Sequence, residues 1–248
     1  MNILIANVGN IRRGEVWALA RALDKNHRVT VAVMSQDSSY RAQAFQFANA
    51  PTRVDNHLIG DIPVYEFFSN PADAVSIMLG EIMIAKPPDL VICGIGNGTN
   101  LAQDIYVSSH VGMAMEAAFL GYKAVVVATE KKSGGHTDAE LEPVIRFIEK
   151  NVEAFAKLKL PRQTFLNINV PQVNRYEELS GIRYTSMGKT TLRSTFDKRT
   201  DPKGETYYYL RHEPQENVKH GENDDKTWYD RGYVSITPIN YDATAEGS

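Results

Sequence analysis

The 248-residue chain has a single cysteine, Cys93, so it cannot close an internal disulfide, and it has no cysteine and histidine cluster at zinc-ligand spacing. Cys93 ends the apolar run Leu-Val-Ile-Cys at residues 90–93. Cysteines in such runs are usually buried, so we expect a structural thiol rather than a nucleophile. The scarcity of cysteine therefore excludes a disulfide-stapled scaffold and a zinc-finger module.

Long apolar runs and a basic excess are also lacking. No run approaches the roughly 18 residues that cross a bilayer, and the opening residues 1–6 are too short and uncharged for a signal peptide. We therefore expect no membrane partner and a cytoplasmic location. The net charge of −3 at pH 7 gives no sign of a surface for nucleic acid polymers. A small nucleotide is not excluded, because a pocket needs only a local array of donors.

Short apolar runs alternate with helical patterns over the first two thirds of the chain. This rhythm predicts an α/β fold with a Rossmann-like, doubly wound, mostly parallel sheet. Residues 35–60 are polar and irregular, so we expect loops there. Strands are expected at residues 3–6, 28–34, 62–68, 89–93, 123–129 and 165–170, and helices around residues 16–23, 71–85, 108–120 and 138–158.

The character of the chain changes at about residue 180, where helical periodicity disappears. Short β-like runs follow, and the turn Asp-Pro-Lys-Gly at residues 201–204 predicts a hairpin. We expect a Rossmann-like core at residues 1–178 and a β-rich arm with a closing strand at residues 179–248. The β-like runs are residues 181–187, 190–195, 205–210 and 232–239, with a polar loop expected at residues 213–226.

Three loops follow expected strands, at residues 7–13, 35–41 and 94–104. In open α/β sheets, ligands bind beyond the carboxyl ends of the strands. The loops are rich in Gly, Asn and Ser, which expose backbone N–H groups, and a helix N-terminus adds a favourable dipole for an anion. There is no GxGxxG after the first strand and no Walker motif. An anion site and a set of plain turns both remain open.

His110 follows two serines, Ser108 and Ser109, near the start of an expected helix. One interpretation is a general acid or a phosphate ligand. The other is an ordinary residue of a helix N-terminus. Arg12 or Arg13 would add positive charge to the same region if its side chain turns inward.

Several segments match one family's motifs in order along nearly the whole chain. Residues 166–171 read Leu-Asn-Ile-Asn-Val-Pro and residues 232–238 read Gly-Tyr-Val-Ser-Ile-Thr-Pro. Residues 70–75 and 88–95 are similar to Thr-Pro-Thr-Asp-Cys-Val and Pro-Asp-Ile-Val-Val-Ser-Gly-Ile, and residues 111–116 to Val-Ala-Ala-Ala-Met-Glu. With these segments the chain resembles the survival protein SurE family of nucleotidases.

The resemblance implies a Rossmann-like core whose β arm exchanges with a neighbouring subunit, and hence a homodimer or homotetramer with residues 179–248 as the oligomerisation arm. It also implies metal-dependent hydrolysis of nucleoside monophosphates. The family's divalent ion is held by two loop aspartates, a serine and an asparagine, hard oxygen ligands that suit Mg²⁺ or Mn²⁺. Such an ion polarises the phosphoryl group and activates water.

Three of the four metal-ligand positions implied by the resemblance are substituted. Val8 and Gly9 stand where the family has its two aspartates, and Gly96 stands at the asparagine position, with Asn97 displaced by one. Ser39 is the only retained family ligand. The loss of both carboxylates removes the charge that offsets dehydration of the ion.

We therefore expect a SurE-like protein with an altered active site that binds a small phosphate- or nucleotide-type ligand without metal-dependent hydrolysis and without a cofactor. One alternative is an active nucleotidase with relocated ligands such as Asp37, which would need Mg²⁺ or Mn²⁺. Another is a non-catalytic structural or partner-binding subunit whose pocket Val8 closes. The candidate catalytic residues are His110 and Ser108, and the candidate ligand-binding residues are Asn7, Val8, Gly9, Asn10, Ser38, Ser39, Gly96, Asn97, Gly98, Asn100 and Ser109.

Overall fold

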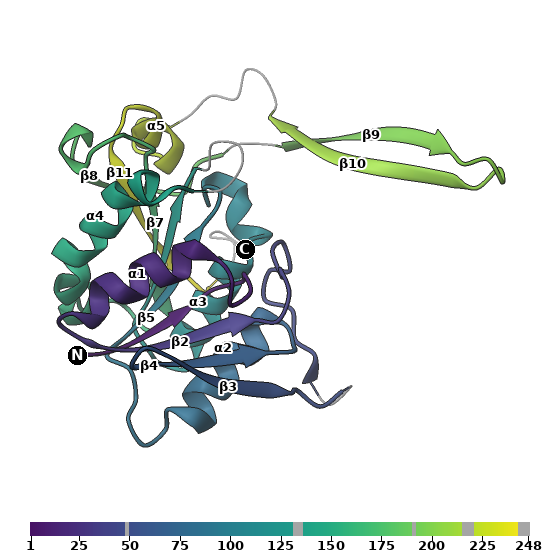
Figure 1. The fold of residues 1–248 in the computed structure, drawn as a ribbon. Helices are drawn as coiled ribbons and strands as arrows, with labels where there is room; N and C mark the ends of the chain where they lie inside the picture. The colour runs from purple at the N-terminus through teal and green to yellow at the C-terminus, as the bar shows by residue number, and fades with distance from the viewer. Residues whose placement is uncertain (48–49, 131–135, 190–191, 215–220, 243–248) are drawn as a thin grey trace.

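The computed structural model describes residues 1–47, 50–130, 136–189, 192–214 and 221–242 (Figure 1). Within these ranges nine strands form one sheet in the order β3-β4-β2-β1-β5-β6-β7-β11-β8. The central six strands are parallel, and β3 and β11 run antiparallel to their neighbours β4 and β7. The predicted α/β fold with a mostly parallel sheet is confirmed. The strands are β1 (Asn2–Ala6), β2 (Arg28–Met34), β3 (Val54–Ile59), β4 (Ile62–Phe67), β5 (Leu90–Gly96), β6 (Ala124–Thr129), β7 (Thr164–Val170), β8 (Ile182–Tyr184) and β11 (Val234–Asn240).

Helices cover both faces of the sheet. Because side chains alternate along a strand, Ile3 and Ile5 of β1 enter one core cluster while Leu4 and Ala6 enter the other. The first cluster packs against α1 (Gly14–Asp24) and α4 (Asp138–Lys157), and the second against α2 (Pro71–Ile77) and α3 (Ser109–Phe119). Among the helices described, none combines the length and apolar composition that a bilayer crossing requires.

Two expectations about local structure in the first half of the chain are wrong. The segment at residues 35–60 ends in a strand, β3, which lies at the sheet edge with most of its residues exposed, so its polar composition hides the strand pattern. The helix expected at residues 71–85 is α2 followed by a π-helical turn, η2 (Met78–Ile82). Short 3-10 helices, η3 (Ala102–Tyr106) and η4 (Tyr176–Glu178), were also not expected.

The loop expected at residues 213–226 is wrong at both ends, because β10 (Thr206–Pro214) continues to residue 214 and α5 (Asp225–Asp230) begins at residue 225. Asp224 caps this helix, because its carboxylate accepts a hydrogen bond from the Thr227 N–H at 2.7 Å. Residues 215–220 of that loop lie outside the described residues.

The predicted hairpin is formed by β9 (Leu192–Thr200) and β10 (Thr206–Pro214), which pair antiparallel as a separate two-stranded sheet. Figure 1 shows this hairpin projecting away from the body of the molecule. The start of the expected run at residues 190–195 lies outside the described residues. Strands β8 and β11 return to the main sheet, so the part of the chain after residue 178 contributes to both the hairpin and the sheet. The division at residue 178 falls at the end of η4 and stays a prediction.

Candidate functional site

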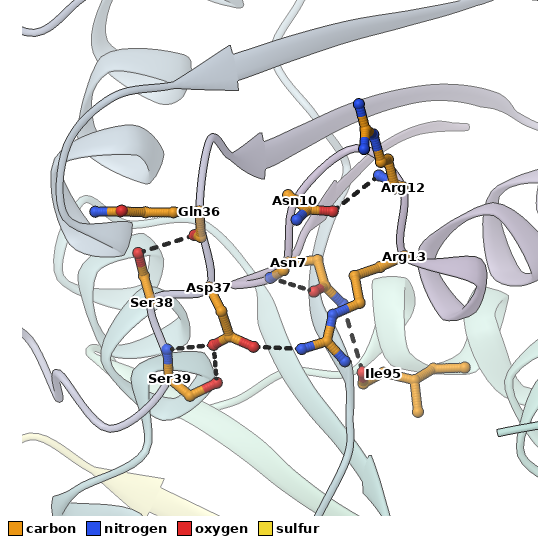
Figure 2. A network of polar contacts seen from close by, with 10 residues as sticks. Asn7, Asn10, Arg12, Arg13, Gln36, Asp37, Ser38, Ser39 and Ile95 are labelled. Atoms are coloured by element: carbon orange, nitrogen blue, oxygen red, sulfur yellow. Dashed lines mark hydrogen bonds and ion pairs between the residues drawn. The ribbon is translucent and has the colours of Figure 1, made fainter. Parts of the chain in front are cut away.

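The three predicted loops meet at the carboxyl edge of the parallel strands. Two backbone hydrogen bonds join the loop at residues 7–13 to the end of β2 and to the loop at residues 35–41. The Met34 N–H donates to the Gly9 carbonyl oxygen at 3.1 Å, and the Ser38 N–H donates to the Val8 carbonyl oxygen at 3.0 Å. The Asn7 side chain reaches the third loop and donates to the Ile95 oxygen at 3.4 Å (Figure 2). The edge therefore brings together chain segments that are far apart in sequence.

A small pocket of about 30 Å³ lies among these loops. This volume leaves room for ordered water between the loops. Its lining residues are Asn7, Val8, Gly9, Arg13, Glu15, Asp37, Ser39, Ile95, Asn97 and His110.

Gly9 lies directly beneath the side chain of Arg13. A Cβ atom at residue 9 would lie 2.5 Å from Arg13 Cγ and 3.1 Å from Asn7 Oδ1. Any other residue at this position therefore requires the arginine to move. The Gly9 N–H donates to Asn7 Oδ1 at 2.8 Å, which holds the loop against the pocket. The neighbouring Val8 is 5% exposed and packs into the core cluster on the α2 and α3 side.

Gly96 has a similar relation to His110. A Cβ atom at residue 96 would lie 3.3 Å from His110 Nδ1, tighter than most real contacts. His110 occupies the first turn of α3 and is 8% exposed. Within the described part of the chain, its buried Nε2 atom has no hydrogen-bond partner. Burial lowers the pKa of His110 to about 4, although nearby Asp37 partly opposes this, so the imidazole is neutral at pH 7.

Arg13, Asp37 and Ser39 form a polar network at the mouth of the pocket (Figure 2). The Arg13 guanidinium pairs with Asp37 Oδ2. Asp37 Oδ1 accepts hydrogen bonds from the Ser39 N–H at 3.0 Å and the Ser39 hydroxyl at 2.6 Å. Burial acts to raise the pKa of Asp37, but the bonds from Ser39 and the charge of Arg13 outweigh it and hold that pKa below 3.8. Asp37 is therefore ionised at neutral pH.

Ser109 and Ser108 hold the start of α3 rather than line the pocket. The Ser109 hydroxyl donates to the Ser38 oxygen at 2.7 Å and accepts from the Arg41 N–H at 2.8 Å, which fastens the second loop to the helix. Ser108 caps α3 by accepting from the Val111 N–H at 3.4 Å. These contacts place His110, since it follows them directly in the helix.

Asn100 anchors the third loop to β7. Its N–H donates to Asn169 Oδ1 at 2.7 Å, and its oxygen accepts from Asn167 Nδ2 at 2.7 Å. Asn10 accepts from the Arg12 N–H at 3.0 Å, and Gly98 is exposed. Of the predicted residues, six thus line the pocket: Asn7, Val8, Gly9, Ser39, Asn97 and His110. The other seven do not line it: Asn10, Ser38, Gly96, Gly98, Asn100, Ser108 and Ser109.

Sequence reasoning left Glu15 and Ile95 out of the candidate site. Glu15 is 6% exposed, lies in the first turn of α1 and lines the pocket. A signal was present, since acidic residues are frequent in first turns and this helix directly follows the first loop. Arg13 turns inward, which the sequence left open.

Comparisons with known proteins agree on one family. Residues 3–194 match the sequence profile of the family described as Survival protein SurE. The chain is 31% identical over 245 residues to the 5'-nucleotidase SurE of Thermoanaerobacter sp. (strain X514), covering 98% of this chain and 94% of that protein. It is 32% identical to the 5'-nucleotidase SurE of Heliobacterium modesticaldum, covering 98% and 88%. The crystal structure of the SurE protein from Aquifex aeolicus superposes with a TM-score of 0.81 at 29% identity, covering 98% of this chain and 95% of that one. The chain belongs to the survival protein SurE family.

Proposed function

We propose that this SurE-family protein binds a phosphate-bearing small ligand, of nucleotide type, at the pocket between the three loops, without metal-dependent hydrolysis. One observation carries the proposal. At Gly9, which the resemblance assigns to a metal-ligand aspartate, the Arg13 side chain takes the space of the missing side chain, and at Gly96, the asparagine position, His110 is the nearest neighbour. A cationic side chain and a neutral imidazole thus lie next to the positions where the family places acidic and amide oxygens.

Arg13 is suited to an anionic ligand. A guanidinium is always protonated and offers a planar fork of N–H donors that matches two phosphate oxygens. Arg13 is also the N-cap of α1, so the positive end of that helix dipole lies at the same place. His110 adds a neutral ring with an unpaired buried nitrogen, and Asn97 adds an amide.

The donor set fits a divalent cation poorly in this arrangement. Mg²⁺ and Mn²⁺ need several oxygen ligands with negative charge. Val8 and Gly9 supply no side-chain oxygen, the Ser39 hydroxyl donates to Asp37, and Arg13 already neutralises that carboxylate. Among the described residues, no three His, Cys, Asp or Glu side chains gather into a metal-binding group. The proposed function therefore involves no metal ion.

A second candidate is an active metal-dependent nucleotidase with relocated ligands. It is favoured by Glu15 and Asp37, two carboxylates that line the pocket together with Ser39 and Asn97. This function requires Arg13 to leave Asp37, with Mg²⁺ or Mn²⁺ taking its place. A third candidate, a non-catalytic structural or partner-binding subunit, is favoured by the small pocket volume and the buried Val8.

The test is calorimetric titration of inorganic phosphate and AMP in the presence of chelator. We expect binding to the unchanged protein and its loss in Arg13→Gln. Arg21→Gln is the matched control, since Arg21 is exposed in the last turn of the same helix. Failure of both ligands to bind at millimolar concentration would remove the proposal. Equal binding by Arg13→Gln would remove the role given to the arginine.

We also propose a homodimer or homotetramer that forms through the hairpin of β9 and β10. A two-stranded hairpin is marginally stable alone in water. This one exposes the apolar side chains of Phe196, Tyr207, Tyr208, Tyr209 and Leu210. A second subunit would cover them, and a monomeric mass by light scattering would contradict this. The cytoplasmic location stays a prediction.

A further inference from the structure

An anionic group already occupies the pocket, and it belongs to the chain itself. The Asp37 carboxylate pairs with the Arg13 guanidinium and accepts both the N–H and the hydroxyl of Ser39. Figure 2 shows the carboxylate between these two residues. These are charged and neutral donors of the kind that a bound phosphate requires.

We propose that Asp37 is an internal competitor for the ligand's anionic group, and that a dianionic phosphate binds by displacing the Asp37 carboxylate from Arg13 and Ser39. This inference rests on the proposed function and names what regulates access to its site. In the described conformation Asp37 holds the donors of Arg13 and Ser39, and its departure frees them for the ligand.

The position of Asp37 in the pocket supports an exchange rather than simple addition. Asp37 lines the pocket and already holds two of its other lining residues, Arg13 and Ser39. The space that Asp37 vacates is adjacent to the donors it leaves behind. The buried His110 Nε2, which has no partner among the described residues, is then available to a further phosphate oxygen.

The contact between Asp37 and Arg13 is weak enough to be exchanged. The two side chains are 46% and 33% exposed, and ion pairs with this much solvent contribute little to stability. Asp37 follows β2 in a loop, so its side chain is able to turn outward without disturbing a strand. The Ser39 hydroxyl, once released, is free to donate to the ligand instead.

The donors that Asp37 releases favour a phosphate monoester over a small carboxylate ligand. Arg13 is positive and His110 is neutral, so the departure of Asp37 leaves the Arg13 guanidinium without its paired carboxylate. A small carboxylate ligand would only replace one monoanion with another at Arg13. A phosphate monoester carries a charge of about −1.5 to −2 at pH 7 and three strong acceptor oxygens. Its larger charge and additional hydrogen bonds drive the exchange.

The test compares inorganic phosphate affinity in Asp37→Asn with the unchanged protein, by calorimetry in chelator. We expect Asp37→Asn to bind phosphate about fivefold more tightly, the factor for losing a competing ion pair of the surface kind. The control is Asp55→Asn, which removes the same charge from another arginine-paired aspartate, bonded to Arg53 at the sheet edge away from the pocket. We expect its affinity to be unchanged, and acetate not to bind the unchanged protein.

The outcomes separate this inference from the proposed function. If both proteins bind phosphate with equal affinity, the competitor role is wrong while the phosphate site stands. Weaker binding by Asp37→Asn would make Asp37 a supporting group of the site and would also overturn the inference. If Asp55→Asn tightened phosphate binding as much as Asp37→Asn, the effect would come from net charge alone and the competitor role would be wrong. Acetate binding as strong as phosphate binding would overturn the preference for a dianion. Absence of binding in both would remove the phosphate site itself. If Asp37→Asn does not fold, the phosphate affinity of Asp37→Ser is measured in its place.

Discussion

Replacing Gly9 with alanine is expected to weaken phosphate binding far more than it weakens the fold. The added Cβ atom would lie 2.5 Å from Arg13 Cγ, a separation that real Cβ atoms essentially never show. Gly9 is not among the described glycines with positive φ, so the backbone itself accepts alanine. The Arg13 side chain therefore has to shift, which disturbs its pairing with Asp37.

The two expected magnitudes follow from the exposure of the groups involved. The ion pair that breaks is one third to one half exposed, so its loss costs at most about 1 kcal/mol of unfolding free energy. A charged hydrogen bond to a bound ligand is worth about 1.5–3 kcal/mol, so the dissociation constant for phosphate should rise about tenfold to a hundredfold. Calorimetric titration and urea denaturation of Gly9→Ala measure the two quantities.

Gly14→Ala is the matched control, because it adds the same methyl group five residues later, where nothing lies within 4 Å of the new Cβ. We expect its phosphate affinity to equal that of the unchanged protein. Wild-type affinity in Gly9→Ala would refute the placement of Arg13 over residue 9. A loss in Gly14→Ala as large as that in Gly9→Ala would refute the local argument as well.

Three further predictions concern buried groups. The pKa of His110 is lowered from 6.5 to about 4, so as the pH falls the unfolded chain is protonated at this residue before the folded protein, and the unfolding free energy should fall by roughly 1.4 kcal/mol per pH unit between about pH 6.5 and 4. In urea denaturation at a series of pH values, His110→Gln should lack this pH dependence. An unchanged pH dependence in His110→Gln would contradict the burial of His110. Asp225→Ala should lower the unfolding free energy by about 3 kcal/mol, since it unpairs the N–H groups of Ala102 and Gly188, each 3.0 Å from the buried carboxylate; a loss below 1 kcal/mol would be inconsistent with those bonds. Burial raises the pKa of the Cys93 thiol, so a disulfide reagent should label it only after unfolding, and rapid labelling of the native protein would show an accessible thiol.

Much of the fold was predictable because central parallel strands are apolar on both faces. An apolar run such as residues 90–93, when a helical pattern follows it, is typical of a buried parallel strand and of few other structures. Strand β3 was missed for the opposite reason, since an exposed edge strand has no buried face to mark it. The helix α5 is six residues long and too short to show a helical period.

The location of the candidate site was predictable from the sequence, but the arrangement of its side chains was not. Strand order alone brings the three loops to one edge, which is why Asn7, Ser39 and Asn97 line one pocket. The inward turn of Arg13 depends on backbone angles in an irregular loop and on the missing Cβ of Gly9, neither of which leaves a periodic pattern. The pairing of Asp37 with Arg13 is likewise a contact between loops 24 residues apart.

The most direct test of phosphate binding without metal hydrolysis measures AMP binding and AMP turnover on one sample, first with Mn²⁺ or Mg²⁺ and then with excess chelator. Metal-free binding through Arg13 predicts the same AMP affinity in both conditions and no phosphate release above the blank in either. Phosphate release that depends on the metal and disappears with chelator would contradict it, and would instead favour Glu15 and Asp37 as relocated metal ligands.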